Sequence, residues 1–233
     1  MNTTRVGDVQ KSRVGRRLLA VGIGAFSLLS AASGLKAEVI LQSNPSFNVA
    51  STPIGETNPG PHRQLAVGIT TGSTAWTFDS MVAQIRTGDP DFAEDQAIFG
   101  GIYSDAGGEP GLLYASFIPI DVEPHVLSVT LTFQTTDPVS LEANTTYWFF
   151  LDSTGKEASW MIPAPETAPV TFAGVSYVDT QLSPDGGATW QPAITNVDVS
   201  INATAIPEPS TSALIAIGSV VGIRSLRRRK FSV

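Results

Sequence analysis

Four carboxylates lie close together in the stretch 89–95 of this chain. They are Asp89, Asp91, Glu94 and Asp95. No basic residue lies among them, and clustered oxygen ligands without basic partners suit a hard cation such as Ca²⁺. Their spacing fits no EF-hand loop, because the glycine and the final bidentate glutamate are misplaced. The stretch is therefore a weak calcium candidate, and a solvated acidic loop is the interpretation that its spacing favours. No other metal or cofactor is expected.

A second pattern with chemical meaning, Ser-Pro-Asp-Gly-Gly-Ala-Thr-Trp, occupies residues 183–190. Its defining residues are Ser183, Asp185, Gly187, Thr189 and Trp190. They match the Asp box, a hairpin turn in which the aspartate caps backbone amides, glycine supplies an unusual dihedral and tryptophan packs beneath. Asp boxes occur in sugar-active enzymes such as sialidases, which bind a substrate carboxylate with three arginines. The box here is single and residues 38–205 hold two arginines, so we predict a structural turn without catalysis.

Other catalytic patterns are missing from the sequence. His62 and His125 have neither zinc-ligand spacing nor a nearby nucleophile, and the chain has no cysteine. The lack of cysteine also excludes disulfides and thiolate metal sites. Hydrolysis would have to depend on carboxylates alone. The tryptophans and tyrosines fall mostly in strand patterns, and we expect them to pack in a core rather than stack on sugars.

The charge of the chain is unevenly distributed. The formal net charge is −7, but residues 38–205 hold 19 acidic residues against three basic ones, a net charge of −16. Nucleic acids and anionic lipid headgroups repel such a surface, because their binding depends on Lys and Arg contacts to phosphate. Nucleic-acid binding is therefore not expected.

The N-terminal segment has the three parts of a secretory signal peptide. Basic residues up to Arg17 precede the apolar stretch 18–32, and small residues follow as far as Ala37. This order predicts a signal helix within residues 1–37, recognition by the export machinery and cleavage by signal peptidase after Ala37, with Ser33 as the second choice. The Arg16-Arg17 pair leaves the general and the twin-arginine export routes open.

The C-terminal segment, residues 206–233, also has three parts. The proline motif Pro207, Glu208, Pro209 is followed by an apolar stretch, and the chain closes with a basic cluster. The cluster consists of Arg224, Arg227, Arg228, Arg229 and Lys230. Proline stops a helix from extending upstream, while the apolar residues suit a membrane helix over 210–226. The basic cluster would stop transfer and stay on the cytoplasmic side.

These three parts, in this order, resemble the PEP-CTERM sorting signal. The resemblance implies that an exosortase, a membrane protease, cleaves near Pro207, Glu208 and Pro209. The protein would then be exported, transiently anchored in the membrane, and passed on to the cell envelope or the outside.

Residues 38–205 predict an all-β domain. Short apolar runs of period two alternate with Gly, Pro, Asp and Asn, and no apolar stripe of helical period occurs between the two ends. Expected strands cover 39–42, 64–70, 76–86, 96–104, 112–118, 127–134, 145–152, 159–162, 170–178 and 196–204. About ten such strands favour an antiparallel β-sandwich, jelly-roll-like in topology.

Three segments of this domain also resemble a known module. They are GITTGSTAWTFDSMVAQI (68–85), IYSDAGGEPGLLYASF (102–117) and LEANTTYWFFLDSTG (141–155). Together they are similar to the choice-of-anchor R domain of surface proteins. That resemblance implies location and architecture, and it carries no activity.

Three functions are compatible with these observations. The first is a non-enzymatic envelope or extracellular-matrix module, and the second is a carbohydrate-binding, lectin-like domain for extracellular polysaccharide, with or without Ca²⁺. The third is a carboxylate-dependent glycan hydrolase, which needs two facing carboxylates. The first requires the fewest features beyond the sequence, so we expect the protein not to be an enzyme.

The signal-peptide interpretation makes a direct prediction. Exported protein should begin at Glu38, and a variant lacking residues 18–32 should stay in the cytoplasm, because the apolar stretch is what the export machinery binds. N-terminal sequencing of the exported fraction measures this. Exported material that begins at Met1 would contradict it.

Overall fold

The computed structural model describes residues 36–43, 47–56, 60–87, 96–122, 128–154, 158–164 and 167–207. Within these ranges every regular element is a β-strand, and every pairing between strands is antiparallel. The predicted all-β class is thereby confirmed for the described part of the chain. The predicted helices of the two ends lie outside it.

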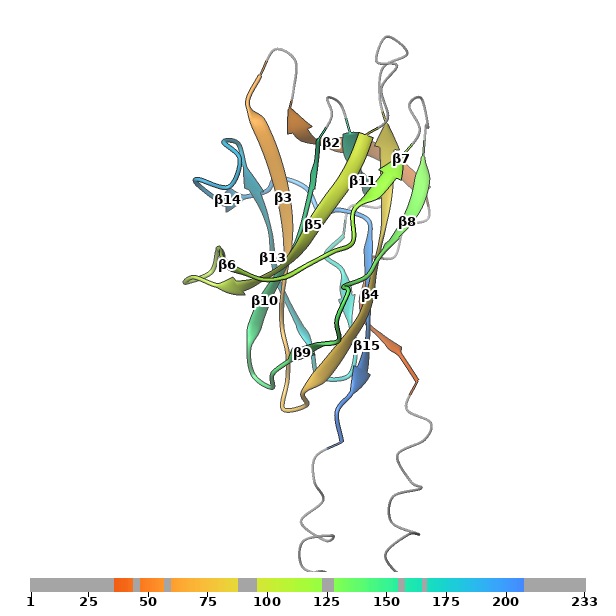
Figure 1. Cartoon of the computed structure of the whole chain (residues 1–233), viewed down its shortest axis with the longest axis vertical. Coiled ribbons are helices and arrows are strands. Elements are labelled where there is room, and N and C mark those ends of the chain that lie inside the picture. The colour runs from red at the N-terminus through yellow and green to blue at the C-terminus, as the bar shows by residue number, and fades with distance from the viewer. Residues whose placement is uncertain are drawn as a thin grey trace, which may run out of the picture. The chain divides into compact units, whose positions relative to one another are not determined.

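The strands range in length from two residues in β12 to twelve in β4 (Figure 1). In chain order they are β1 (Glu38–Gln42), β2 (Phe47–Glu56), β3 (His62–Thr70), β4 (Trp76–Thr87), β5 (Gln96–Asp105), β6 (Pro110–Ser116), β7 (Ile120–Val122), β8 (Val129–Phe133), β9 (Val139–Leu141), β10 (Thr146–Ser153), β11 (Ala158–Ala164), β12 (Val170–Thr171), β13 (Ser176–Ser183), β14 (Gln191–Pro192) and β15 (Val199–Ala205).

The strands form one hydrogen-bonded network that folds into a sandwich-like pair of layers. The first layer contains the neighbours β12, β1, β15, β4, β11 and β2, with β8 and β9 on the other edge of β4. The second layer contains β3, β10, β5 and β6 in that order, with β13 on β3 and β7 on β5. The layers are continuous where Gly55 of β2 pairs with Arg63 of β3.

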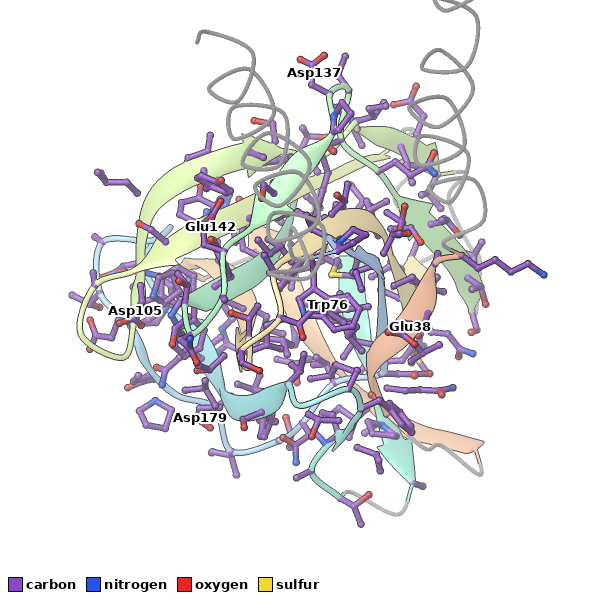
Figure 2. The ribbon with its side chains drawn as sticks, turned by 90° about the horizontal axis from the view of Figure 1, so that it is seen from below. Glu38, Trp76, Asp105, Asp137, Glu142 and Asp179 are labelled. Carbon is purple, nitrogen blue, oxygen red and sulfur yellow. The ribbon has the colours of Figure 1, made fainter. Side chains whose placement is uncertain are left out.

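The core lies between the two layers. Strands β15 and β4 contribute Ile201 and Met81, and β3 and β10 contribute Val67 and Phe149, all with no exposed surface. In β15 the inward apolar residues alternate with polar ones, as in a half-buried sheet, whereas β3 and β10 are buried on both faces. Trp76 also lies in this interior, whereas Asp105 and Asp137 lie at the periphery (Figure 2).

The first and last strands of the domain are neighbours. Glu38 of β1 pairs with Ala203 of β15, so the chain enters and leaves the domain at the same end of this strand pair. Ile206 makes the last backbone hydrogen bond near this end, from its amide to the carbonyl of Ala75 (2.8 Å). The last described strand, β15, therefore ends two residues before Pro207.

Two parts of the strand prediction are wrong. The expected strand over 170–178 is divided into β12 and β13, because Ala173 and Gly174 adopt positive φ angles of 54° and 79° and turn the chain. Strand β2 was not predicted, because its polar residues, Pro53 and Gly55 leave no alternation of apolar and polar residues in its sequence. The short strands β7, β9 and β14 were also missed, since two or three residues show no period.

The position of the core predicts that alanine substitutions at two phenylalanines have very different effects on the free energy of unfolding. Phe149→Ala should lower the free energy of unfolding by about 3–5 kcal/mol, because it leaves a cavity between the layers. Phe172→Ala, at a side chain that is 44% exposed, should change it by less than about 0.5 kcal/mol. Urea unfolding followed by tryptophan fluorescence measures both, and equal losses would contradict the placement of the core.

Candidate functional site

Some of the residues predicted to form functional sites lie within the described structure. The Asp-box residues are described, and the strand ends place Ala37 and Pro207 at the two borders of the domain. The rest lie outside the described residues: Asp89, Asp91, Glu94, Asp95, Glu208, Pro209, Arg224, Arg227, Arg228, Arg229 and Lys230.

The Asp-box segment connects β13 to β14 as a hairpin. Asp185 accepts hydrogen bonds from the amide (2.8 Å) and the hydroxyl (2.7 Å) of Thr189. The buried hydroxyl of Ser183 donates to Asp185 (2.9 Å) and accepts from the amide of Gly187 (2.7 Å). Gly186 and Gly187 have φ angles of 72° and 91°, a region that other residues adopt only with strain. Each polar side chain of the box is thus used to close the turn.

The hydrogen bonds of the turn lower the pKa of the Asp185 carboxyl. The hydroxyl and then the amide of Thr189 hold the pKa of the Asp185 carboxyl below its ordinary value of 3.8, because they stabilise the charged form. Asp185 is therefore an anion at neutral pH. Its lone pairs face the turn itself, so the geometry describes a cap rather than a general acid.

A buried carboxylate lies beneath this hairpin, on the outer side of the second layer. Asp152 is 2% exposed and accepts hydrogen bonds from His62 Nε2 (2.8 Å) and from the side-chain amide of Gln64 (2.8 Å). The amide of Gly186 in turn donates to the carbonyl of His62 (2.9 Å). The hairpin is thus held to the start of β3 next to this polar cluster.

An aromatic cluster continues this surface beside the polar one. Trp148 of β10 is fully buried, with its ring against the backbone of Gly68, where a Cβ would lie 2.7 Å from the ring. Its indole donates to Asp105 (2.9 Å), which also caps the amides of Gly107 and Gly108. Trp190 of the Asp-box segment packs on this cluster. The outer aromatic residues therefore form a second small core.

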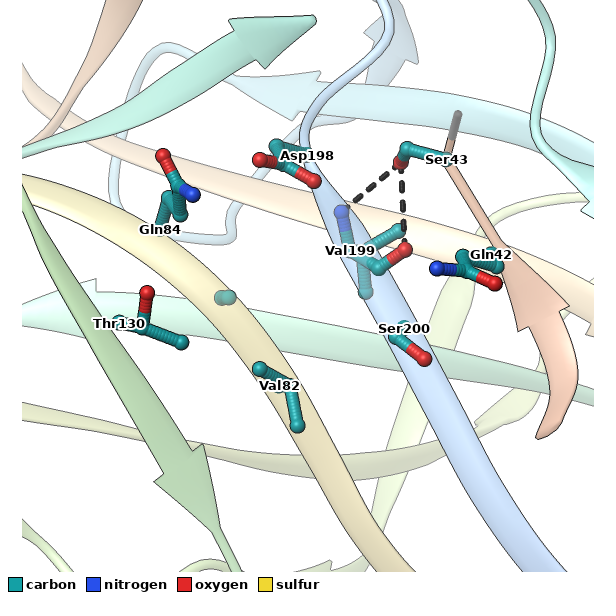
Figure 3. A pocket seen from close by; sticks show the side chains of 9 residues that line it. Gln42, Ser43, Val82, Gln84, Thr130, Asp198, Val199 and Ser200 are labelled. Carbon is teal, nitrogen blue, oxygen red and sulfur yellow. Dashed lines mark hydrogen bonds between the residues drawn. The ribbon is translucent and has the colours of Figure 1, made fainter. Parts of the chain in front are cut away.

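The first layer carries a different feature, a hollow on its outer face that polar and apolar residues line together (Figure 3). The hollow has a volume of about 210 Å³. It is lined mainly by Gln42, Val82, Gln84, Thr130, Asp198 and Ser200. A second hollow of about 240 Å³ shares Gln42 and Ser43 and is completed by Val170 and Phe172. We call the two hollows together the Gln42 groove.

The floor of the Gln42 groove is fixed by a buried serine. Ser43 is 1% exposed, and its hydroxyl accepts a hydrogen bond from the amide of Val199 (2.8 Å) and donates to the carbonyl of Val197 (2.8 Å). Figure 3 shows Ser43 bonded to Val199 at the point where β1 ends. The strands that carry Gln42 and Ser200 are thus held in a set geometry.

Sequence reasoning missed this groove and the His62–Asp152 pair. The water-facing positions of the predicted strand 196–204, Asp198 and Ser200 among them, were the one available signal. Nothing local connects them to Gln42 or Phe172, which lie on other strands. His62 and Asp152 are 90 positions apart, so their contact has no local signal.

No family model matches the chain, and no curated protein matches it significantly. Among the described residues, no group of three or more His, Asp or Glu side chains is placed to hold a metal ion. In the same part of the chain, no helix has the length and apolar character to cross a membrane.

The pKa of Asp185 makes a prediction about pH. A lowered folded-state pKa contributes stability above the unfolded value of 3.8, and this contribution is lost as pH falls through the folded value. The Asp185→Ala variant should therefore melt at a lower temperature than wild type at neutral pH. The difference should shrink as pH falls below about 4.

Thermal melts over this pH range measure the difference. Asp137→Ala removes another exposed carboxylate, at the connection between β8 and β9, and serves as the matched control. A difference between wild type and Asp185→Ala that stays constant with pH would contradict the proposed cap.

Proposed function

We propose that this chain is an exported surface or matrix protein whose β domain is a non-catalytic module. It is held in the membrane by residues 210–226 and is then released by an exosortase that cuts near Pro207, Glu208 and Pro209. The observation that carries the proposal is the order of proline motif, apolar stretch and basic cluster at the C-terminus. Its partners are the export machinery, signal peptidase and the exosortase.

The borders of the folded domain support this proposal. Strand β1 begins at Glu38, directly after the predicted signal-peptidase site, so cleavage after Ala37 leaves the strand whole. Strand β15 ends at Ala205, and Pro207 is exposed. A protease would therefore meet the proline motif immediately outside the domain, without unfolding it.

The use of the carboxylates supports a non-catalytic role. Asp105 bonds the Trp148 indole and two turn amides, Asp152 bonds His62 and Gln64, and Asp185 bonds Thr189. Each of these carboxylates stabilises a turn or a buried cluster. A glycan hydrolase instead needs two carboxylates that face each other across a cleft.

We further propose that the domain is similar to the choice-of-anchor R module and has a jelly-roll-like topology. The pairing of the first and last strands, β1 with β15, supports this topology. So does the position of β10 between β3 and β5, which are distant from it in sequence. Such neighbours are typical of Greek-key connections.

The sorting proposal predicts different effects for two changes at the C-terminus. Glu208→Ala should leave membrane insertion intact and abolish processing, because the residue lies outside the apolar stretch but within the proline motif. Deletion of residues 224–230 should weaken retention and disturb orientation, because these charges fix the cytoplasmic side. Cell fractionation with an antibody to the β domain, in a host with the cognate exosortase, measures both.

A matched control separates the motif from general effects of charge. Glu109→Ala removes an exposed glutamate from the turn between β5 and β6 and should be processed like wild type. Processing of Glu208→Ala at the wild-type level would refute exosortase recognition of this motif.

A further inference from the structure

The Gln42 groove lies on a surface built by five strands. Strand pairing places Gln42 opposite Val170 on one side and Ser200 on the other. Ser200 is paired in turn with Val82, and Val82 with Thr132. Directly paired residues point to the same face of a sheet, so these five side chains form one row across β12, β1, β15, β4 and β8.

The length of this row sets the size of a ligand. Neighbouring strands lie about 4.8 Å apart, so the three intervals from Val170 to Val82 cover roughly 14 Å. The two hollows of the groove lie along this line and share Gln42. A ligand that fills both is therefore longer than a single sugar ring or a metal ion.

The chemistry of the lining residues indicates a polyhydroxylated ligand. The residues that line the first hollow of the groove include polar, uncharged side chains: the amides of Gln42 and Gln84 and the hydroxyls of Thr130 and Ser200. Amides and hydroxyls both donate and accept hydrogen bonds, which matches the alternating donors and acceptors of sugar hydroxyl groups. Asp198 adds an acceptor of greater strength.

An apolar surface completes the groove at its other end. Phe172 is 44% exposed and Val170 is 47% exposed, and both line the hollow next to Gln42. The C–H face of a sugar ring is apolar, and an aromatic ring beside polar groups offers it a matching surface.

The charge of the groove excludes acidic ligands. No Lys, Arg or His is among the residues that line either hollow, whereas Asp198 is. The surrounding domain, residues 38–205, carries a net charge of −16. Phosphorylated, sulfated or uronic-acid chains would be repelled both locally and at long range.

From these observations we infer that the Gln42 groove binds a neutral oligosaccharide. One sugar ring lies against Phe172 and Val170, and the next is hydrogen-bonded by Gln42, Gln84 and Ser200. Because Ser43 already holds the strands in place, the site needs little rearrangement on binding. This inference goes beyond the sorting proposal and does not depend on exosortase processing.

The test uses the full chain, purified in a zwitterionic detergent that contains no sugar. An array of neutral and uronate-containing oligosaccharides is screened, and the dissociation constant of the best neutral binder is measured by calorimetry. We expect binding to neutral glycans alone. Phe172→Ala and Gln42→Ala should each weaken it by about tenfold, as loss of a central contact does.

Matched controls distinguish the groove from the rest of the surface. Ile194→Ala removes an apolar side chain that is 99% exposed, and Gln191→Ala removes an exposed glutamine of β14. Both should bind like wild type. The inference is overturned by binding to uronate-containing glycans alone, by no binding to any glycan, or by Phe172→Ala and Gln42→Ala variants that bind like these controls. Thermal melts of each variant show that the domain remains folded.

Discussion

Contact between aromatic rings across the two layers is the interaction on which the rest of the structure depends. The ring of Phe78 in β4 lies 5.6 Å from that of Phe149 in β10 and 5.7 Å from that of Phe117. Phe117 lies 5.8 Å from Phe133 of β8. These rings connect strands of both layers in a protein without cysteine, so apolar packing rather than a disulfide holds the faces of the two layers together. The outer features, including the Gln42 groove, are placed by strands that this core holds.

The two outer faces of the sandwich use polar residues in opposite ways. On the second layer, Asp105, Asp152 and Asp185 accept hydrogen bonds from indole, imidazole, amide and hydroxyl groups, and they fasten turns to the sheet. On the first layer, Gln42 and Thr130 line an open hollow. Among the described residues, Asp105 and Asp185 are hydrogen-bonded by uncharged donors, namely an indole, backbone amides and a hydroxyl. High salt should therefore weaken these hydrogen bonds less than it would weaken surface ion pairs.

Local patterns predicted the elements whose signal lies within their own residues. The strict alternation in β15 and β8 was sufficient to recognise both strands, because each has one face in the core and one in water. The hydrogen bonds of Asp185 involve only residues 183–189, so its turn could be inferred from the local sequence 183–190. Strand β2 lacks a period, and Ile40 and Leu41 are both buried at a bulge in β1, so register there follows from tertiary packing. The Gln42 groove joins residues up to about 160 positions apart, a relation that one sequence does not contain.

The adjacency of β1 and β15 has a mechanical consequence. A protein that is tethered by its C-terminus and bound to a fixed glycan would carry any pulling force along β15. This strand is hydrogen-bonded to β1 on one edge and to β4 on the other. Antiparallel ladders run perpendicular to the strands, so a pull along β15 loads many hydrogen bonds at once in shear. Peeling them one at a time would need a pull across the strand. Strand β15, which ends beside the proline motif, would therefore be loaded in shear along both of its edges by such a pull.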